Sequence, residues 1–308
     1  MPAAVGAEPA LPRVAGSSSL KAIVLGPEGG AGRLGFYAAV MGLEPCVGPD
    51  GVQVLDLGPG GAACEALARV VMEAFGQVDA PVLRRRLGSL AVAAASRVRA
   101  GAAAGRDLRL GTGEVRLTER RHAHAGFFGL EVLDLAHRRF DGAMGPEIRR
   151  EVFVSGDAVT VLPYDPRRDR VLLVEQFRAG PFGRGDPLPW QLEAIAGRVD
   201  PGETPEDAAR REALEEAGLV LGPLEMVAEY YPSPGAMTEY IYSYVAITDL
   251  PDGVAGVRGA EDEAEDIRGH LLSFEALMAA VARGEVANAP LILTALWLQR
   301  ERGWLRKA

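Results

Sequence analysis

Three glutamates in the second half of the chain could hold a divalent cation. Glu212, Glu215 and Glu216 lie three and four residues apart, so in a helix their carboxylates share one face. Like charges repel one another, and Arg211, four residues before Glu215, offers one positive charge against three negative ones. Carboxylate oxygens on a rigid element suit Mg²⁺, which also takes waters and substrate phosphates. The spacing therefore predicts a metal site, against the alternative of a solvated acidic helix face.

The surrounding residues predict the helix that carries these carboxylates. Thr204 is a suitable N-cap, Pro205 suits the first helical position, and Glu206 favours the positive end of the helix dipole. Residues 208–217 are mostly good helix formers, and Gly218 supplies the stop. We therefore expect a loop, a helix and a second loop.

The stretch also fits a longer pattern, Gly-x5-Glu-x7-Arg-Glu-x-x-Glu-Glu-x-Gly-hydrophobic. Its fixed positions are Gly197, Glu203, Arg211, Glu212, Glu215, Glu216, Gly218 and Leu219. This pattern resembles the Nudix box of the Nudix hydrolases, a family that hydrolyses pyrophosphates. Ala213 departs from it slightly, since that position is usually a larger apolar residue.

Composition and charge narrow the class of protein. The 308 residues are 48% hydrophobic and 24% charged, which is typical of a soluble globular protein. A net charge of −9 argues against a nucleic-acid-binding surface. The two cysteines, Cys46 and Cys64, lack metal-site spacing and indicate a reducing compartment. We see neither a signal-peptide pattern nor an apolar run of eighteen residues, and expect a cytoplasmic protein without membrane partners.

Changes in residue composition and pattern along the sequence predict that the chain has three parts. Residues 1–19 are expected to be a flexible tail, and residues 20–105 a smaller α+β domain. In that domain residues 33–43 faintly resemble gamma-glutamyl-cyclotransferase-like domains, whose Tyr-Gly-Thr-Leu-type loop is missing here, so we expect a degenerate form. Residues 106–308 combine strands, including one over residues 152–162, with helices. They predict an α/β fold, a Nudix α/β/α sandwich with an N-terminal β extension.

Two weaker patterns are interpreted as structural. Gly30, Gly32 and Gly35 match a dinucleotide phosphate loop, but they begin too far after the preceding strand, which favours a surface connection. His122 and His124 would face one side of a strand. Without a third ligand nearby, two surface histidines are favoured over a metal site.

Segments on both sides of the box resemble the ADP-ribose pyrophosphatase subfamily. Residues 171–178, 190–197 and 230–239 are similar to its corresponding segments, and Pro234 lies sixteen residues after the last glycine of the box, as in that subfamily. Residues 288–292 resemble the start of its C-terminal helix. The likeness is strongest to a longer bacterial form that is associated with tellurite resistance and carries an extra N-terminal domain.

The resemblance implies a hydrolase that converts ADP-ribose, a nucleotide sugar, to AMP and ribose 5-phosphate. It implies Mg²⁺ or Mn²⁺ as cofactor, with two or more ions per site. Glu263 is then the general base, and Glu212 and Glu216 are catalytic metal ligands. Further implied metal contacts are the Ala196 carbonyl, Glu215 and Glu265; substrate contacts are Arg178, Glu193, Ser233, Pro234, Gly235 and Glu239; and structural box residues are Gly197, Glu203, Arg211 and Gly218.

The resemblance also implies a homodimer with a swapped N-terminal β extension. The adenine would stack on an aromatic side chain, for which Phe127, Phe128 and Phe140 are candidates. The alternative substrates are another nucleoside diphosphate sugar or a dinucleotide, such as GDP-mannose or NADH. A sensor that binds ADP-ribose without cleaving it is a further alternative, which the presence of every box carboxylate disfavours.

Overall fold

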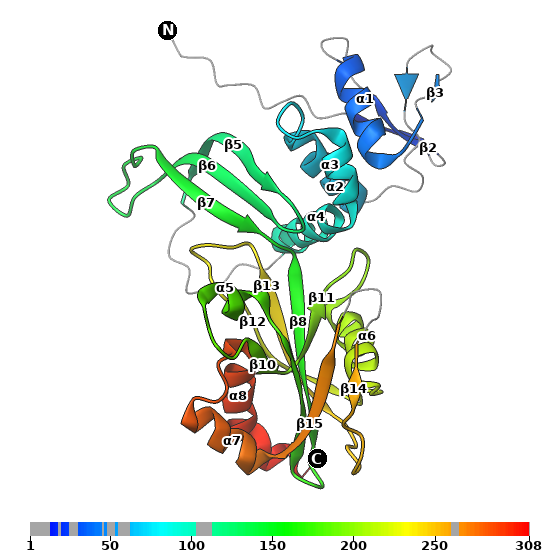
Figure 1. Ribbon diagram of the computed structural model, residues 1–308. Coiled ribbons are helices and arrows are strands. Elements are labelled where there is room, and N and C mark those ends of the chain that lie inside the picture. The colour runs from blue at the N-terminus through cyan, green and yellow to red at the C-terminus, as the bar shows by residue number, and fades with distance from the viewer. Residues whose placement is uncertain are drawn as a thin grey trace. The chain divides into compact units, whose positions relative to one another are not determined.

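The computed structural model describes residues 13–17, 20–24, 30–44, 46–47, 53–54, 62–102, 113–259 and 265–307 (Figure 1). Contacts divide the chain into two compact units. The first comprises Met1–Gly156 with Gly235–Thr238, and the second comprises Asp157–Pro234 with Glu239–Ala308. The predicted boundary near residue 105 and most of the predicted tail lie outside the described residues.

The first unit contains helices, two small strand pairs and a separate sheet. Tyr37, Val40, Val71 and Leu83 are buried together and form part of the helical core. Gly30, Gly32 and Gly35 lie within a helix, and the resemblance to cyclotransferase-like domains stays a prediction. The elements of this α+β part are β1 (Arg13–Ser17), β2 (Leu20–Val24), α1 (Gly30–Met41), β3 (Cys46–Val47), β4 (Gln53–Val54), α2 (Ala62–Glu73), α3 (Ala80–Arg85) and α4 (Leu87–Ala102).

Three antiparallel strands complete the first unit. They are β5 (Val115–Ala125), β6 (Gly129–His137) and β7 (Ile148–Val154), in the order β5-β6-β7. The strand expected over residues 152–162 is divided, because β7 ends at Val154 and β8 begins at Asp157. The two pieces belong to different compact units.

The second unit is built on a mixed sheet with the strand order β12-β13-β8-β9-β15-β14. Strand β10 pairs with β9, β11 pairs with β8, and β13 runs parallel to β8 while the other pairs are antiparallel. The strands are β8 (Asp157–Asp165), β9 (Arg170–Phe177), β10 (Trp190–Glu193), β11 (Ile195–Arg198), β12 (Leu224–Tyr230), β13 (Tyr240–Ile247), β14 (Val257–Arg258) and β15 (Ile267–Ser273).

Helices cover both faces of this sheet (Figure 1). In β8, Val159 and Val161 pack into the core that includes the alanines of α6 (Pro205–Ala217), whereas Leu162 and Tyr164 pack into the core that includes α7 (Phe274–Arg283) and α8 (Ala289–Leu305). Alternate residues of one strand thus enter opposite cores, as the period of two requires. The predicted α/β/α sandwich is confirmed. A short helix, α5 (Ala179–Arg184), connects β9 to β10.

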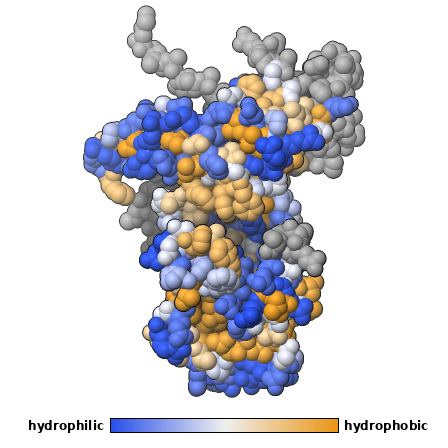
Figure 2. All heavy atoms as spheres, viewed as in Figure 1, coloured by the Kyte–Doolittle hydropathy of each residue, from blue (hydrophilic) through white to orange (hydrophobic). Residues whose placement is uncertain are grey.

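The surface of each unit carries polar and apolar side chains together. On the face drawn in Figure 2, hydrophilic and hydrophobic residues are interspersed. Of the helices in the described part of the chain, none has the length and apolar character needed to cross a membrane.

Candidate active site

Helix α6 begins and ends where local signals dictate. The Thr204 hydroxyl accepts a hydrogen bond from the Asp207 amide at 3.1 Å, and Pro205 occupies the first turn. Gly218 ends the helix with a φ of 63°, a left-handed conformation that glycine adopts without strain. Ala213 is fully buried against the sheet, which explains a small residue at this position of the box.

Arg211 joins the loop before α6 to the helix. Its Nε donates to Glu203 at 2.8 Å, and its Nη2 donates to the Arg198 carbonyl at 2.9 Å. Its Nη1 donates to Glu212 at 2.7 Å and to Glu215 at 3.1 Å. The hydrogen bond from Arg211 holds the pKa of Glu203 below its usual range. Arg211 thus bonds both the loop before α6, through Glu203 and Arg198, and α6 itself, through Glu212.

Gly197 makes room for a carboxylate. A Cβ at this position would lie 1.8 Å from Oε1 of Glu212 and 1.9 Å from its Cδ. The side chain of Glu212 therefore lies directly against the backbone of β11, in space that only glycine leaves open. The glycine at the start of the box is explained by this close approach and not by its backbone angles.

Two box carboxylates lie close to one another, Glu216 buried and Glu212 partly buried. Glu216 is 3% exposed, and its Oε2 accepts a hydrogen bond from the Ala196 amide at 3.3 Å. Burial, and then the charge of Glu212, raise the pKa of Glu216 to about 8; the charge of Arg178 acts in the opposite direction. Burial raises the pKa of Glu212 to about 7, with Arg211 opposing. Glu265 adds negative charge at both sites, so these carboxylates form one electrostatic cluster.

This cluster fits a hard divalent cation by the chemistry of its donors. Buried carboxylates with raised pKa values are groups whose negative charge lacks compensation, and a cation would supply it. The space that Gly197 leaves beside Glu212 brings a carboxylate to the strand that holds Ala196. Within the residues that the structure describes, which omit 260–264, no three acidic, histidine or cysteine side chains form a ready-made metal site. In this conformation Glu212 is instead paired with Arg211.

A cavity of about 320 Å³ adjoins the start of the box. It brings the box residues Ala196 and Gly197 together with three predicted substrate contacts, Arg178, Glu193 and Glu239. Burial raises the pKa of Glu239, while Arg198 and Arg178 oppose this effect. The lining residues are Ala158, Val159, Thr160, Arg178, Glu193, Ala194, Ala196, Gly197, Arg198, Glu239, Ile241, Asn288 and Pro290.

Some lining residues were not among the predicted site residues. Asn288, Arg198 and Thr160 each line the cavity without an assigned role. For Asn288 the sequence offered a signal, since Asn before Ala-Pro is a typical helix start, and it is indeed the N-cap of α8. Thr160 and Arg198 lie in strands, where their types and spacing give no such signal.

Ser233–Gly235, Glu215 and Glu263 were also among the predicted site residues. Ser233, Pro234 and Gly235 are exposed, and none of them lines this cavity. Glu215 is half-exposed and bonded to Arg211. Glu263, the predicted base, lies outside the described residues. The roles of Ser233–Gly235, Glu215 and Glu263 stay predictions, as do the roles of the other predicted site residues.

The aromatic candidates for stacking on adenine lie in the first unit. Phe127 and Phe128 pack edge to face with ring centroids 4.8 Å apart. Phe128 also packs against Phe153, at 4.7 Å. Phe140 is fully exposed. All three candidates present accessible ring surface, and their role stays a prediction.

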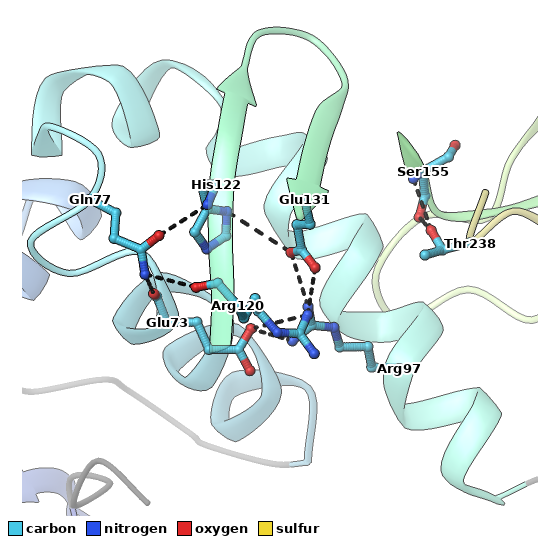
Figure 3. A network of polar contacts seen from close by, with 8 residues as sticks. All are labelled: Glu73, Gln77, Arg97, Arg120, His122, Glu131, Ser155 and Thr238. Atoms are coloured by element: carbon cyan, nitrogen blue, oxygen red, sulfur yellow. Dashed lines mark hydrogen bonds and ion pairs between the residues drawn. The ribbon is translucent and has the colours of Figure 1, made fainter. Parts of the chain in front are cut away.

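The prediction of two surface histidines holds for His124 and is wrong for His122. His124 is exposed, but the side chain of His122 is only 8% exposed. In the network of Figure 3, His122 lies 3.9 Å from Glu131 of β6. Arg120 bonds Glu131 at 2.6 Å, and Arg97 of α4 bonds Glu73 of α2 at 2.7 Å. Burial lowers the pKa of His122.

This network explains why the three-stranded sheet groups with the helices. Gln77, just after α2, accepts from the His122 amide at 3.0 Å and donates to the Arg120 carbonyl at 3.1 Å. Figure 3 also shows Thr238, whose hydroxyl donates to the Ser155 carbonyl at 2.7 Å. Gly235–Thr238 belong to the first unit, and this contact is one of those that join the segment to it.

The box lies within a stretch of the chain that matches a known protein family. A family model described as NUDIX domain matches residues 154–294. An ADP-ribose pyrophosphatase of Escherichia coli (strain K12) is 40% identical over 189 residues, which are 61% of this chain and 90% of that protein. One of Haemophilus influenzae (strain ATCC 51907 / DSM 11121 / KW20 / Rd) is 32% identical over 197 residues, 63% of this chain and 90% of that protein.

A second group of relatives carries another name. A GDP-mannose pyrophosphatase of Enterobacter sp. (strain 638) is 34% identical over 152 residues, which are 49% of this chain and 78% of that protein. Box, fold and relatives agree on one class of protein, the pyrophosphohydrolases built on this sandwich. The chain belongs to the Nudix family.

Proposed function

We propose that this protein hydrolyses the pyrophosphate bond of ADP-ribose to give AMP and ribose 5-phosphate. One observation carries the proposal: a single cavity joins the start of the Nudix box, at Ala196 and Gly197, to the charged residues Arg178, Glu193 and Glu239. A phosphate-binding guanidinium beside a cluster of metal-binding carboxylates is what pyrophosphate cleavage requires. The relatives named ADP-ribose pyrophosphatase support the choice of substrate.

The metal would be held by oxygen ligands of the box and its surroundings. We propose Glu212, Glu216, Glu265 and the Ala196 carbonyl as ligands of Mg²⁺ or Mn²⁺, with Glu215 acting directly or through water. We also propose that each active site binds two or more of these ions. When bound, they neutralise phosphate oxygens and lower the pKa of a coordinated water.

The protein's own residues bind the substrate and move protons. Arg178 would bind a phosphate of ADP-ribose, and Glu193 would hold the guanidinium group in place. Glu239 and the Ser233–Gly235 segment would contact the sugar. A water oxygen bonds to one phosphorus while the bridging oxygen leaves with the other phosphate. Glu263 would take the proton of that water.

The proposal extends to the assembly. We infer a homodimer with a swapped N-terminal β extension, in which Phe127, Phe128 or Phe140 stacks on the adenine. Their exposed rings support this assignment. A cytoplasmic location and a link to tellurite resistance are parts of the proposal that rest on resemblance alone.

A second candidate substrate is GDP-mannose, because a relative named GDP-mannose pyrophosphatase is 34% identical to this chain over 152 residues. A panel of ADP-ribose, GDP-mannose, NADH and 8-oxo-dGTP with Mg²⁺ distinguishes the candidates through kcat/KM. We expect ADP-ribose to be preferred, with AMP and ribose 5-phosphate as products. Preference for GDP-mannose would overturn the substrate but keep the chemistry. Binding of ADP-ribose without turnover would indicate a sensor.

A further inference from the structure

Asn288 uses both ends of its side-chain amide. As the N-cap of α8, its Oδ1 accepts a hydrogen bond from the Leu291 amide at 3.0 Å. Its Nδ2 donates to Oε1 of Glu193 at 2.8 Å. Asn288 also lines the cavity of the proposed active site. One residue therefore connects the start of a helix to a carboxylate in the substrate cavity.

Glu193 is in turn bound to Arg178. Its side chain is buried, and Oε2 accepts from Nε of Arg178 at 2.8 Å and lies 2.6 Å from Nη2. Both carboxylate oxygens are thus engaged: Oε1 by Asn288 and Oε2 by Arg178. This leaves Nη1 as the nitrogen of Arg178 that the pair does not use. Arg178 follows β9 as the N-cap of α5, Glu193 ends β10 and Asn288 is the N-cap of α8, so three separate elements meet here.

We infer that Asn288 is a positioning residue for the substrate's phosphate, a role that rests on the proposed function. The terminal torsion of a glutamate is soft, and the Asn288 amide fixes it. The fixed carboxylate holds the guanidinium of Arg178 in one plane and leaves Nη1 for an anionic oxygen. A long arginine side chain has much rotational freedom to lose, so fixing it before binding lowers the cost of binding.

The competing explanation is that Asn288 only caps its helix. Asn288→Ser separates the two, because serine keeps a cap acceptor but has no amide to reach Glu193. Asn288→Asp also keeps the acceptor and adds a second negative charge beside Glu193. Ser273→Ala is the matched control, since Ser273 caps α7 in the same way, accepting from the Ala276 amide at 3.1 Å, away from the cavity.

We expect Asn288→Ser to raise the KM for ADP-ribose about tenfold, as the loss of one hydrogen bond to a charged group does. Asn288→Asp raises it further. In both variants kcat stays within about twofold, because the metal-binding carboxylates are untouched. Asn288→Ser keeps a Tm close to that of the wild type, whereas Ser273→Ala lowers the Tm and leaves KM unchanged. An unchanged KM in both Asn288 variants would overturn the inference.

A double variant tests whether the effect passes through Arg178. If it does, Asn288→Ser raises KM no further in an Arg178→Ala background. A full additional rise in that background would show a separate role and contradict the inference. Failure of the proposed function can be told apart from failure of this inference, because in the former case the wild-type protein does not hydrolyse ADP-ribose. The same variants are then compared on GDP-mannose, where a raised KM supports the positioning role and an unchanged KM overturns it.

Discussion

Replacing Gly197 with alanine tests the close approach of Glu212 to β11. A Cβ here would lie 1.8 Å from Oε1, 1.9 Å from Cδ and 2.5 Å from Cγ of Glu212, where ordinary contact begins at 3.4 Å. The carboxylate must therefore retreat by about 1.6 Å. Since Cγ is also too close, rotation of the carboxylate alone cannot relieve the overlap.

That displacement should be visible in the rate of hydrolysis. A catalytic group misplaced by about 1 Å costs roughly a hundredfold in rate, so kcat for ADP-ribose should fall by about that factor. KM should change less than kcat, because Arg178 and Glu193 are untouched although Gly197 lines the cavity. The added methyl group also strains the packing and should lower the free energy of unfolding by about 1–3 kcal/mol.

The assay measures initial rates over a range of Mg²⁺ and ADP-ribose concentrations, with chemical denaturation to check the fold. Gly303→Ala is the matched control, because a Cβ at Gly303 in α8 meets nothing within 4 Å. That variant should keep its activity and gain stability, since alanine favours a helix over glycine. A folded Gly197→Ala protein with kcat within threefold of the wild type would refute the reasoning.

Two further predictions concern stability. Thr204→Ala removes the acceptor for the Asp207 amide and should lower the free energy of unfolding by about 1 kcal/mol, measured by denaturation. Asp169→Asn should be most destabilising at pH 7. The hydrogen bond from Arg302, aided by Tyr164, holds the pKa of Asp169 below its usual range. A lowered carboxyl pKa gives stability that is complete above the unfolded value, about 3.9, and lost as pH falls through the folded value.

A second substitution controls for Thr204→Ala, and a pH series controls for Asp169→Asn. Thr204→Ser keeps the hydroxyl and should restore most of the stability lost in Thr204→Ala; equal losses would contradict the capping role. For Asp169→Asn, the difference from the wild type should shrink between pH 7 and pH 3. A difference that stays constant over this interval would contradict the role of the Asp169 charge.

The box helix could be predicted almost to the residue because its signals are local. Thr204, Pro205 and Gly218 fix its ends through contacts within a few residues. The division of the expected strand at residues 155–156 could not be predicted from the sequence. Both pieces contain strand-forming residues, whereas the break coincides with a distant contact: a Cβ at Gly156 would lie 2.2 Å from Cγ1 of Val92.

The rest of the site depends on contacts between distant residues. The family resemblance predicted Arg178 and Glu193 as substrate contacts, and both line the cavity. The same resemblance gave Asn288 no role. Asn288 is 95 residues from Glu193, and only packing of α8 on the sheet brings them together. The contact of the His122 amide with Gln77 likewise joins residues 45 positions apart, which sequence spacing does not reveal.

The most direct test of a metal-dependent Nudix mechanism is hydrolysis of ADP-ribose by the wild type and by Glu216→Gln, with Mg²⁺ and with excess chelator. Glutamine matches the shape of the buried side chain without its charge, so the variant should fold. We expect equal amounts of AMP and ribose 5-phosphate from the wild type, no turnover with chelator, and a kcat at least about a hundredfold lower in the variant. Turnover that survives both chelator and Glu216→Gln would contradict the account.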